Sequence, residues 1–326
     1  MATNKNEKKG FSFKELMSKS GMGVLLAFVV LCIFLSITTK AFLSTANLMV
    51  VLRQSVWVGL LAIGMTFIIA TGEIDLSVGS TVGFCGMIVA ALLKNYNAPV
   101  ILALLAAIAV GILIGCVNGF LAAKVKIASF IATLAMQQIL RGLIYVYTGG
   151  VPIFGLKIPS FTVLAQGYIG FIPVPIIILA VLTAIFWYVM YRTKFGRHVL
   201  STGSNIDAAR LVGINVDSVK MKVYILTGFL ASISGILLAA RSEAAIVEAG
   251  SGYETDAIAA VVIAGTSMAG GSANLLGCIL GAVLMTTIRN GLNLLKVGSS
   301  WHQVVIGIVI ILSLIFDKAV NSGKKG

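Results

Sequence analysis

The chain has 326 residues, of which 59% are hydrophobic and only 11% are charged, and its mean hydropathy is +1.04. A soluble domain usually carries about 25% charged residues, so this composition excludes an ordinary soluble fold and indicates an integral membrane protein. The formal net charge of +13 does not indicate nucleic-acid binding, because Lys and Arg cluster in short polar segments without interleaved aromatic residues. We therefore expect a lipid bilayer, and no nucleic acid, as the surroundings of this chain.

Apolar runs follow one another along the sequence, and a helix needs about 20 such residues to cross a membrane. Several runs are shorter than that, so some helices are expected to be tilted, broken or re-entrant. The sequence predicts an all-α integral membrane fold with about ten transmembrane helices. The runs lie at residues 23–39, 56–71, 78–93, 98–123, 127–147, 174–191, 223–240, 257–270, 274–288 and 303–316.

Lys and Arg gather in alternate connections between these runs, which is typical of the cytoplasmic side of a membrane. The basic loop 192–222 is therefore expected inside, and the long connections 148–173 and 241–256 outside. An even number of crossings then leaves both ends of the chain in the cytoplasm. The predicted order is a cytoplasmic N-terminal tail, a single transmembrane domain and a cytoplasmic C-terminal tail, at residues 1–22, 23–316 and 317–326.

No motif in the sequence supplies the parts of an enzyme active site. The chain has no GxxxxGK[ST] loop for ATP, no HExxH and no GxSxG. Its two histidines, His198 and His302, lie far apart, and its four cysteines fall in apolar runs without a CxxC pair. We expect no catalytic residue, no metal site and no cofactor bound by this chain, and therefore a transport protein.

The loop 192–222 contains the pattern of a short capped helix. Ser204 or Asn205 can cap it, because these side chains accept backbone N–H bonds at a helix start, and the helix is expected to continue through 206–212. Gly213 is expected to end it, since glycine tolerates the reversal behind a helix. By itself this pattern fits either a surface helix or a docking element.

The stretch DAARLVG at 207–213 resembles the EAA-xxx-G loop of the permeases of ABC importers. Asp207 replaces the Glu of that family, and the later Leu-Pro is missing. The resemblance implies a coupling helix that docks in a cleft of an ATPase subunit. Its expected residues are Asn205, Asp207, Ala208, Ala209, Arg210 and Gly213.

Three polar residues, Glu73, Asp75 and Ser77, stand at the junction of the second and third apolar runs. Acids at the edge of a membrane are unfavourable and become functional candidates, here for gating a pathway. Asp75 or Ser77 can instead cap the third helix, and Asp256 can cap the eighth, with Gly265 ending it. Gating and capping both stay open at this stage.

Polar side chains also interrupt the fourth and fifth runs. Gln137, Gln138 and Arg141 lie in the fifth, where Gln137 and Arg141 are four residues apart and share one helix face. They either line a passage for a hydroxyl-rich solute or form an interhelical hydrogen-bond set. Asn118, in the fourth run, offers the same two interpretations.

Four separated segments resemble, in order, the ribose-type permeases of sugar ABC importers. They are GEIDLSVGS at 72–80, the loop described above, GYETDAIAAVVIAGTS at 252–267 and NGLNLL at 290–295. The resemblance covers about residues 40 to 316. It implies two permease subunits around one pathway, a cytoplasmic ATPase that holds ATP and Mg, and an extracytoplasmic sugar-binding protein. We expect the second permease subunit to be identical and the membrane to be the cytoplasmic (inner) membrane of a bacterium.

The expected function is thus passage of a monosaccharide, ribose or a related sugar, by alternating access that a partner ATPase drives. Permeases of this family carry ribose, xylose, arabinose, galactose and signalling sugars, so the sequence identifies no single one. The alternative is an ion-coupled secondary transporter of a small polar solute. Such carriers usually need intramembrane acids, and no long apolar run of this chain has one at its centre.

Overall fold

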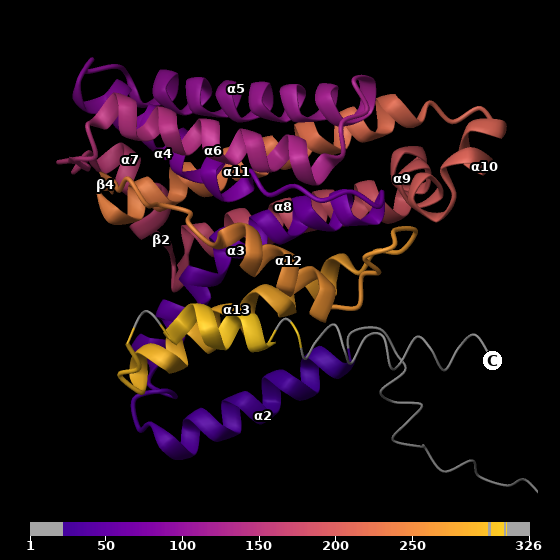
Figure 1. The fold of residues 1–326 in the computed structure, drawn as a ribbon. Helices are drawn as coiled ribbons and strands as arrows, with labels where there is room; N and C mark the ends of the chain where they lie inside the picture. Colours follow the sequence, from indigo (N-terminus) through magenta and orange to yellow (C-terminus); the bar gives the residue numbers. More distant parts are fainter. Residues whose placement is uncertain (1–21, 299–300, 310, 312–326) are drawn as a thin grey trace, which may run out of the picture.

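The computed structural model describes residues 22–298, 301–309 and 311, and long helices run back and forth between two ends of the molecule (Figure 1). The predicted C-terminal tail, and all but the last residue of the predicted N-terminal tail, lie outside the described residues. Residues 301–309 are helical. The other helices are α2 (Met22–Thr38), α3 (Thr45–Ala70), α4 (Val78–Lys94), α5 (Val100–Gly119) with its π-helical continuation η1 (Phe120–Lys124), α6 (Ser129–Thr148), α7 (Pro159–Gln166), α8 (Val174–Arg192), α9 (Lys194–Ser204), α10 (Ile206–Leu211), α11 (Val216–Ser242), α12 (Tyr253–Ile263) and α13 (Leu275–Leu294).

Strands in the described residues are limited to two antiparallel pairs. β1 (Ile153–Phe154) pairs with β4 (Ala244–Ala245), and β2 (Tyr168–Ile169) pairs with β3 (Ile172–Pro173). The first pair joins the two long connections that the sequence places on one side of the membrane. The prediction of an essentially all-α fold is confirmed, since these strands have only two residues each.

Six described helices are long and apolar enough to cross a membrane, namely α3, α5 with η1, α6, α8, α11 and α13. By contrast, α12 has 11 residues, or about 16 Å at 1.5 Å per residue, roughly half the thickness of the hydrocarbon layer. The apolar run 257–270 is therefore not one helix. α12 begins at Tyr253 and ends at Ile263, and Gly265, with a φ of +86°, turns the chain into the non-helical segment 264–274.

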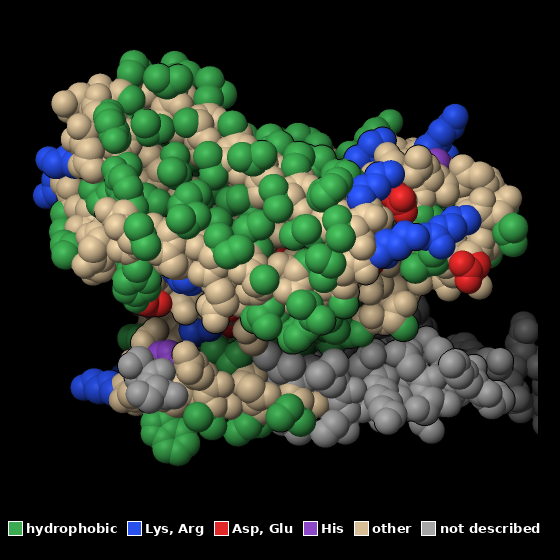
Figure 2. All heavy atoms as spheres, turned by 45° about the horizontal axis from the view of Figure 1, so that its top comes forward, with side chains coloured by type: hydrophobic (Ala, Val, Ile, Leu, Met, Phe, Trp, Pro, Cys, Tyr) green, Lys and Arg blue, Asp and Glu red, His purple; other side chains and the backbone are tan. Residues whose placement is uncertain are grey.

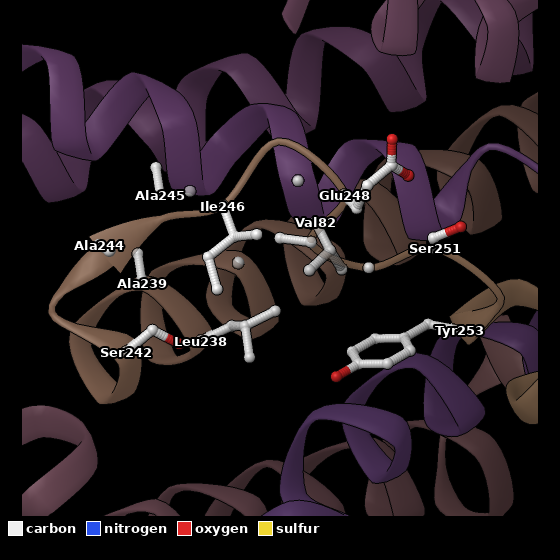
Figure 3. A pocket seen from close by; sticks show the side chains of 15 residues that line it. Val82, Leu238, Ala239, Ser242, Ala244, Ala245, Ile246, Glu248, Ser251 and Tyr253 are labelled. Carbon is white, nitrogen blue, oxygen red and sulfur yellow. The ribbon is translucent and has the colours of Figure 1, made fainter. Parts of the chain in front are cut away.

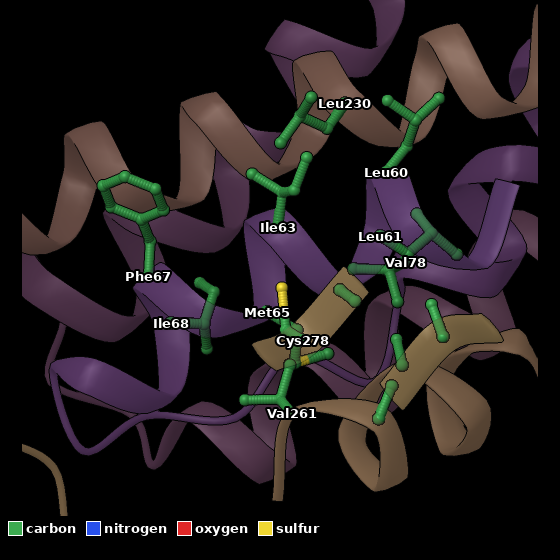
Figure 4. Close-up of a cluster of buried hydrophobic side chains, with 14 of the residues drawn as sticks. Leu60, Leu61, Ile63, Met65, Phe67, Ile68, Val78, Leu230, Val261 and Cys278 are labelled. Carbon is green, nitrogen blue, oxygen red and sulfur yellow. The ribbon is translucent and has the colours of Figure 1, made fainter. Parts of the chain in front are cut away.

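The centre of the hydrophobic core is α3. Every residue from Ser55 to Ala70 is buried, as expected for a helix that is apolar on all sides. Figure 4 shows Ile63 pointing toward Leu230 of α11, and Met65 beside Cys278 of α13. α8, α11, α12 and α13 pack around α3, so its residues 55–70 have protein rather than lipid as their neighbour.

Direct backbone contact joins α11 to α5. A Cβ atom added at Gly111 would lie 2.5 Å from the carbonyl oxygen of Gly228, and one at Gly115 would overlap the carbonyl oxygen of Tyr224. Lipid tails are as apolar as the helices, so close packing of this kind is a main source of helix association in membranes. The Gly-xxx-Gly spacing of α5, at Gly111 and Gly115, allows this close approach.

The two ends of the bundle differ in charge and structure. α9, α10 and the connection between η1 and α6 lie at one end, and α7 and the strand pairs lie at the other (Figure 1). Figure 2 shows Lys and Arg gathered at the end that carries α9 and α10, whereas hydrophobic side chains cover most of the surface between the ends. We call these the α10 end and the α7 end.

Substitution of Gly228 by Leu tests the contact between α5 and α11. We expect Gly228→Leu to lower the free energy of unfolding by about 2–3 kcal/mol, because the added side chain meets the backbone of α5. Gly142 of α6 is the matched control, since a Cβ atom there meets nothing within 4 Å. Thermal unfolding in detergent measures both variants, and equal destabilisation by the two would contradict the packing argument.

Candidate functional site

A non-helical segment, residues 71–77, connects α3 to α4 inside the bundle. Side chains of α6 satisfy its backbone: Ser129 accepts a hydrogen bond from the N–H of Ile74 at 3.3 Å, and Thr133 accepts one from the N–H of Leu76 at 3.1 Å. Irregular backbone is tolerated at membrane depth only where protein shields it. Contacts with α6 thus hold the segment in place. It carries the polar side chains of Glu73, Asp75 and Ser77.

Three of the predicted pathway residues meet in this segment. Asp75, which is 3% exposed, accepts hydrogen bonds from the backbone N–H of Ser77 at 2.8 Å and from its hydroxyl group at 2.7 Å. The side-chain amide of Asn118, on α5, donates to the same hydroxyl oxygen at 2.8 Å. Ser77 stands at the N-cap of α4, but its side chain makes no capping bond. The buried trio therefore links α5 to the α3–α4 connection, and the capping interpretation is wrong for Ser77.

Glu73, the fourth residue of this group, forms an ion pair with Lys220 of α11. Both side chains are largely buried, so the pair neutralises charge inside the protein. Sequence reasoning missed Lys220, although a buried acid requires a cation near it. Glu73 and Lys220 also line a cavity of about 340 Å³ together with Ile206 and Arg210 of α10, which brings the polar segment next to the predicted coupling helix.

The short helix α10 has the predicted form. Asn205 is its N-cap and accepts a hydrogen bond from the backbone N–H of Ala208 at 2.9 Å, and Gly213 follows the helix with a φ of +83°. Asp207, Ala208 and Arg210 are exposed, whereas Ala209 is buried against the chain itself. Of the predicted docking residues, Ala209 therefore anchors α10 to its own bundle and lies off the exposed face.

Sequence reasoning missed the two most exposed apolar residues of this region. Leu211, the last residue of α10, is 88% exposed, and Val212 beside it is 76% exposed. They stand at the basic α10 end, where water or another protein is the expected neighbour. An apolar tip on a capped helix is the kind of feature that a partner covers.

Near the α7 end, α6 holds the first turn of α12 and the segment that precedes it. Gln137 donates to Glu254 at 3.2 Å, and Arg141 donates to the carbonyl oxygen of Val247 at 3.0 Å, so the predicted shared face is confirmed. One turn further along, the hydroxyl group of Tyr145 donates to Glu248. Gln138 is exposed on another face of α6 and does not join this set.

Asp256 does not cap α12, contrary to the interpretation that the sequence left open. Gly252 is the N-cap, and Asp256 lies in the first turn with its side chain fully buried. Both of its carboxylate oxygens accept hydrogen bonds from Arg289 of α13, at 2.8 and 2.9 Å. This bidentate pair ties the half-length helix α12 to α13, and an arginine at the end of an apolar run was the available signal for it.

A cavity of about 240 Å³ opens between α4, α11 and the segment that leads into α12. Figure 3 shows Val82, Leu238, Ile246 and the ring of Tyr253 around it, with Ser242 and Glu248 at its edge. The cavity is mostly apolar with a few polar groups, and it borders the segment that α6 holds. The polar sites are thus divided between the two ends of the bundle, with the packed core of α3 between them.

Comparison with known proteins agrees with this architecture. A family described as branched-chain amino acid transport system / permease component matches residues 47–314. The ribose import permease protein RbsC of Bacillus subtilis (strain 168) is 41% identical over 313 residues, covering 96% of this chain and 96% of that protein. RbsC of Escherichia coli (strain K12) is 40% identical over 300 residues, covering 90% and 92%.

A xylose transport system permease protein, XylH of Haemophilus influenzae, is 34% identical over 364 residues and covers 93% of this chain and 96% of that protein. No solved structure matches the chain.

A double-mutant cycle tests the pair between α12 and α13. Asp256→Asn is expected to lower the free energy of unfolding by about 3 kcal/mol, because it leaves the Arg289 charge without its buried partner. Arg289→Gln is expected to have a similar effect, and the double variant to lose less than the sum of the two. Thermal unfolding in detergent measures the coupling free energy between the two residues. If the losses in unfolding free energy of the two single variants simply add in the double variant, the pairing is contradicted.

Proposed function

The chain belongs to the family of branched-chain amino acid transport system permease components, and we propose that it is the membrane-spanning subunit of an ATP-driven importer for ribose or a related monosaccharide. Near-complete coverage of the ribose permeases supports this proposal, since no large part of the chain is left for another activity. ATP and Mg bind to a partner ATPase, and this chain holds no cofactor of its own. The membrane is the cytoplasmic membrane of a bacterium.

The single observation that carries the proposal is the exposed tip of α10. Leu211 and Val212 are both more than three-quarters exposed, at 88% and 76%, and Asn205 fixes the start of the helix that presents them. A rigid, capped helix with an apolar tip presents an anchor that a complementary pocket can bury with little loss of conformational entropy. We assign this tip to the cleft of the ATPase subunit, with Asp207, Ala208 and Arg210 beside it.

A movement of α10 can be transmitted to the bundle through α9. α9, which precedes α10, approaches the end of α3 so closely that a Cβ atom at Gly203 would overlap the carbonyl oxygen of Ala70. The N–H of Gly271, in the connection between α12 and α13, donates to the same oxygen at 3.0 Å. A shift of α9 and α10 therefore acts on α3 and on the α12–α13 pair together.

The second contact of α10 is with the polar segment before α4. The cavity that Ile206 and Arg210 share with Glu73 and Lys220 separates the helix from that ion pair. In our proposal, ATP-driven displacement of α10 alters this cavity and strains the pair between Glu73 and Lys220. The trio of Asp75, Ser77 and Asn118 then moves with the segment, which makes this region the inner gate.

The proposed topology has ten membrane-spanning segments, with α12 as a half-length member, and both ends of the chain in the cytoplasm. The α10 end faces the cytoplasm, because it carries the basic residues of the loop 192–222 and the connection between η1 and α6. The tails 1–22 and 317–326 lie on that side. The α7 end faces outward, so the paired connections that hold β1 and β4 form the docking surface for a sugar-binding protein.

Alternating access then couples the two ends of the bundle. A docked binding protein presses on the segment that Gln137, Arg141 and Tyr145 of α6 hold, and this segment borders the outer cavity. We place the outer mouth of the sugar pathway there. A second copy of this chain completes the pathway across the assembly.

Two acids of the bundle that an ion-coupled carrier could use are already paired with cations. Asp256 is neutralised by Arg289, and Glu73 by Lys220. A carboxylate that is already paired with arginine or lysine is a poor site for a coupling ion. Ion-driven carriers bind such ions with intramembrane acids that have no cationic partner. The alternative function therefore has no specific support in these two acids.

Purification of the tagged chain from its native membranes in a mild detergent tests the proposal. We expect an ATPase subunit to copurify in stoichiometric amount, and ribose uptake into vesicles to require ATP. Scrambling residues 204–213 is expected to abolish the copurification while the chain still inserts into the membrane. A chain that copurifies with no ATPase and transports without ATP would overturn the proposal in favour of an ion-coupled carrier.

A narrower test addresses the apolar tip alone. Leu211→Asp is expected to reduce the copurified ATPase at least about tenfold, because a carboxylate in a buried cleft loses its hydration without a partner. Leu43 is the matched control, since it is 61% exposed and lies in the turn before α3, at the opposite end. Leu43→Asp should leave the amount of ATPase unchanged, and equal losses in the two variants would contradict the assignment.

A further inference from the structure

Two arginines share a pocket that the transport mechanism does not use. Arg53, in the third turn of α3, and Arg241, in the last turn of α11, line a cavity of about 460 Å³ with Gln166, Tyr168 and Ser242. All five residues lie at the α7 end of the bundle. The positive charges of the two arginines are close enough to repel each other, so the pocket is a local concentration of cationic charge.

Neither guanidinium group has an anionic partner in the described part of the chain. The ion pairs found there involve other residues. Each of the two groups lies instead on an aromatic ring, Arg53 at 4.6 Å from the centre of Tyr168 and Arg241 at 5.8 Å from that of Trp57. An aromatic ring attracts a cation without neutralising its charge, so both charges stay available.

The donors of Arg53 are also incompletely satisfied. Its Nε and Nη2 atoms are buried and have no hydrogen-bond partner. A buried guanidinium donor without a partner is unfavourable, so the site lacks acceptor oxygens. Glu243 is the nearest acid along the chain to Arg241, but it is engaged by Gln166 at 3.2 Å and by Lys157 at 4.0 Å.

An apolar groove begins beside this pocket. Its volume is about 550 Å³ and its walls come from α3, α8 and α13. Leu52 lines the groove and its chain neighbour Arg53 lines the pocket, while Tyr168 of the pocket lies six residues before α8, whose residue Ile176 lines the groove. α3 and the chain that leads into α8 therefore contribute residues to both the cationic pocket and the apolar groove.

The β2–β3 hairpin, which carries Tyr168 of the pocket, exposes apolar side chains, and we call this part of the hairpin the rim. Phe171, in the turn between β2 and β3, is 85% exposed, and Ile169 beside it is 64% exposed. Aromatic and aliphatic side chains at the end of a bundle are typical of the level of lipid headgroups. The pocket, its rim and the groove together match a molecule with an anionic oxygen-rich head and an apolar tail.

We propose that this pocket binds the phosphodiester group of an anionic phospholipid, with Arg53 and Arg241 on the phosphate oxygens and an acyl chain in the groove. Guanidinium groups bind phosphate oxygens through paired, charge-assisted hydrogen bonds, which supplies the acceptors that Arg53 lacks. The lipid then fastens α3 to α11 and to the β2–β3 hairpin at the outer end.

Native mass spectrometry of the full chain in detergent tests the site, with phosphatidylglycerol as the probe. We expect a bound lipid that the variant with both Arg53→Gln and Arg241→Gln binds at least about tenfold more weakly. Arg192→Gln is the matched control, because Arg192 also lies over an aromatic ring, 5.9 Å from the centre of Trp187, but at the α10 end. This control should keep the lipid.

Two further arms use the unaltered chain, so the test does not depend on the folding of a variant. Diacylglycerol with the same acyl chains should not bind to the pocket, and inorganic phosphate should not displace phosphatidylglycerol at equal concentration. Equal binding of diacylglycerol would show that the arginines are not used, and displacement by phosphate would assign the site to a free anion. Absence of lipid, together with loss of binding-protein docking in the double variant, would overturn the proposal and assign the arginines to a protein carboxylate.

Discussion

The backbone contact of α11 with its neighbours is the constraint on which the rest of the bundle depends. Hydrophobic side chains gain little by leaving lipid for a protein interior, so helices in a membrane need other reasons to stay together. α11 meets α5 where Gly111 and Gly115 face Gly228 and Tyr224, and it meets α4 where Gly235 faces the carbonyl oxygen of Val82. These contacts fix α11 over most of its length and thereby fix Lys220 near one end and Arg241 near the other.

Two ion pairs attach further elements to the helices that backbone packing holds together. Lys220 of α11 holds Glu73 before α4, and Arg289 of α13 holds Asp256 of α12. Each pair joins one of the long helices to an element that is short or irregular. An ion pair sets favourable attraction against lost hydration, so its net strength changes with the access of water to the site. Backbone packing thus holds the long helices together, whereas ion pairs hold the short or irregular elements to them.

The sequence predicted most of the helices because hydropathy is a local property. It placed the start of α3 too late, at residue 56 instead of Thr45, because Arg53 and Gln54 interrupt the apolar run. It also offered Asn205, with Ser204 as the alternative, as a cap from neighbouring residues alone, and Asn205 is the cap. The pairing of Asp256 with Arg289 joins residues 33 positions apart, and no local pattern distinguishes an acid that caps a helix from one that pairs across helices.

The same limit explains why the predicted site residues divide into separate groups. Glu73, Asp75, Ser77 and Asn118 come together because α5 returns to the α10 end, whereas Gln137 and Arg141 lie on the part of α6 that has moved away from it. Polarity within an apolar run marks a side chain that needs a partner, but only the fold decides which one. The sequence therefore showed which polar side chains need a partner, but not which side chains from different helices come together.

The division of the polar residues between the two ends of the bundle has a mechanical consequence. A carrier that opens alternately to two sides needs a polar, adjustable region at each end and a sealed region between them. Here the inner group lies beside α10, the outer group lies beside the segment before α12, and the residues of α3 from Ser55 to Ala70 are buried between them. Because α9 contacts the end of α3 at Ala70, displacement at the α10 end acts directly on the helix that lies between the two groups.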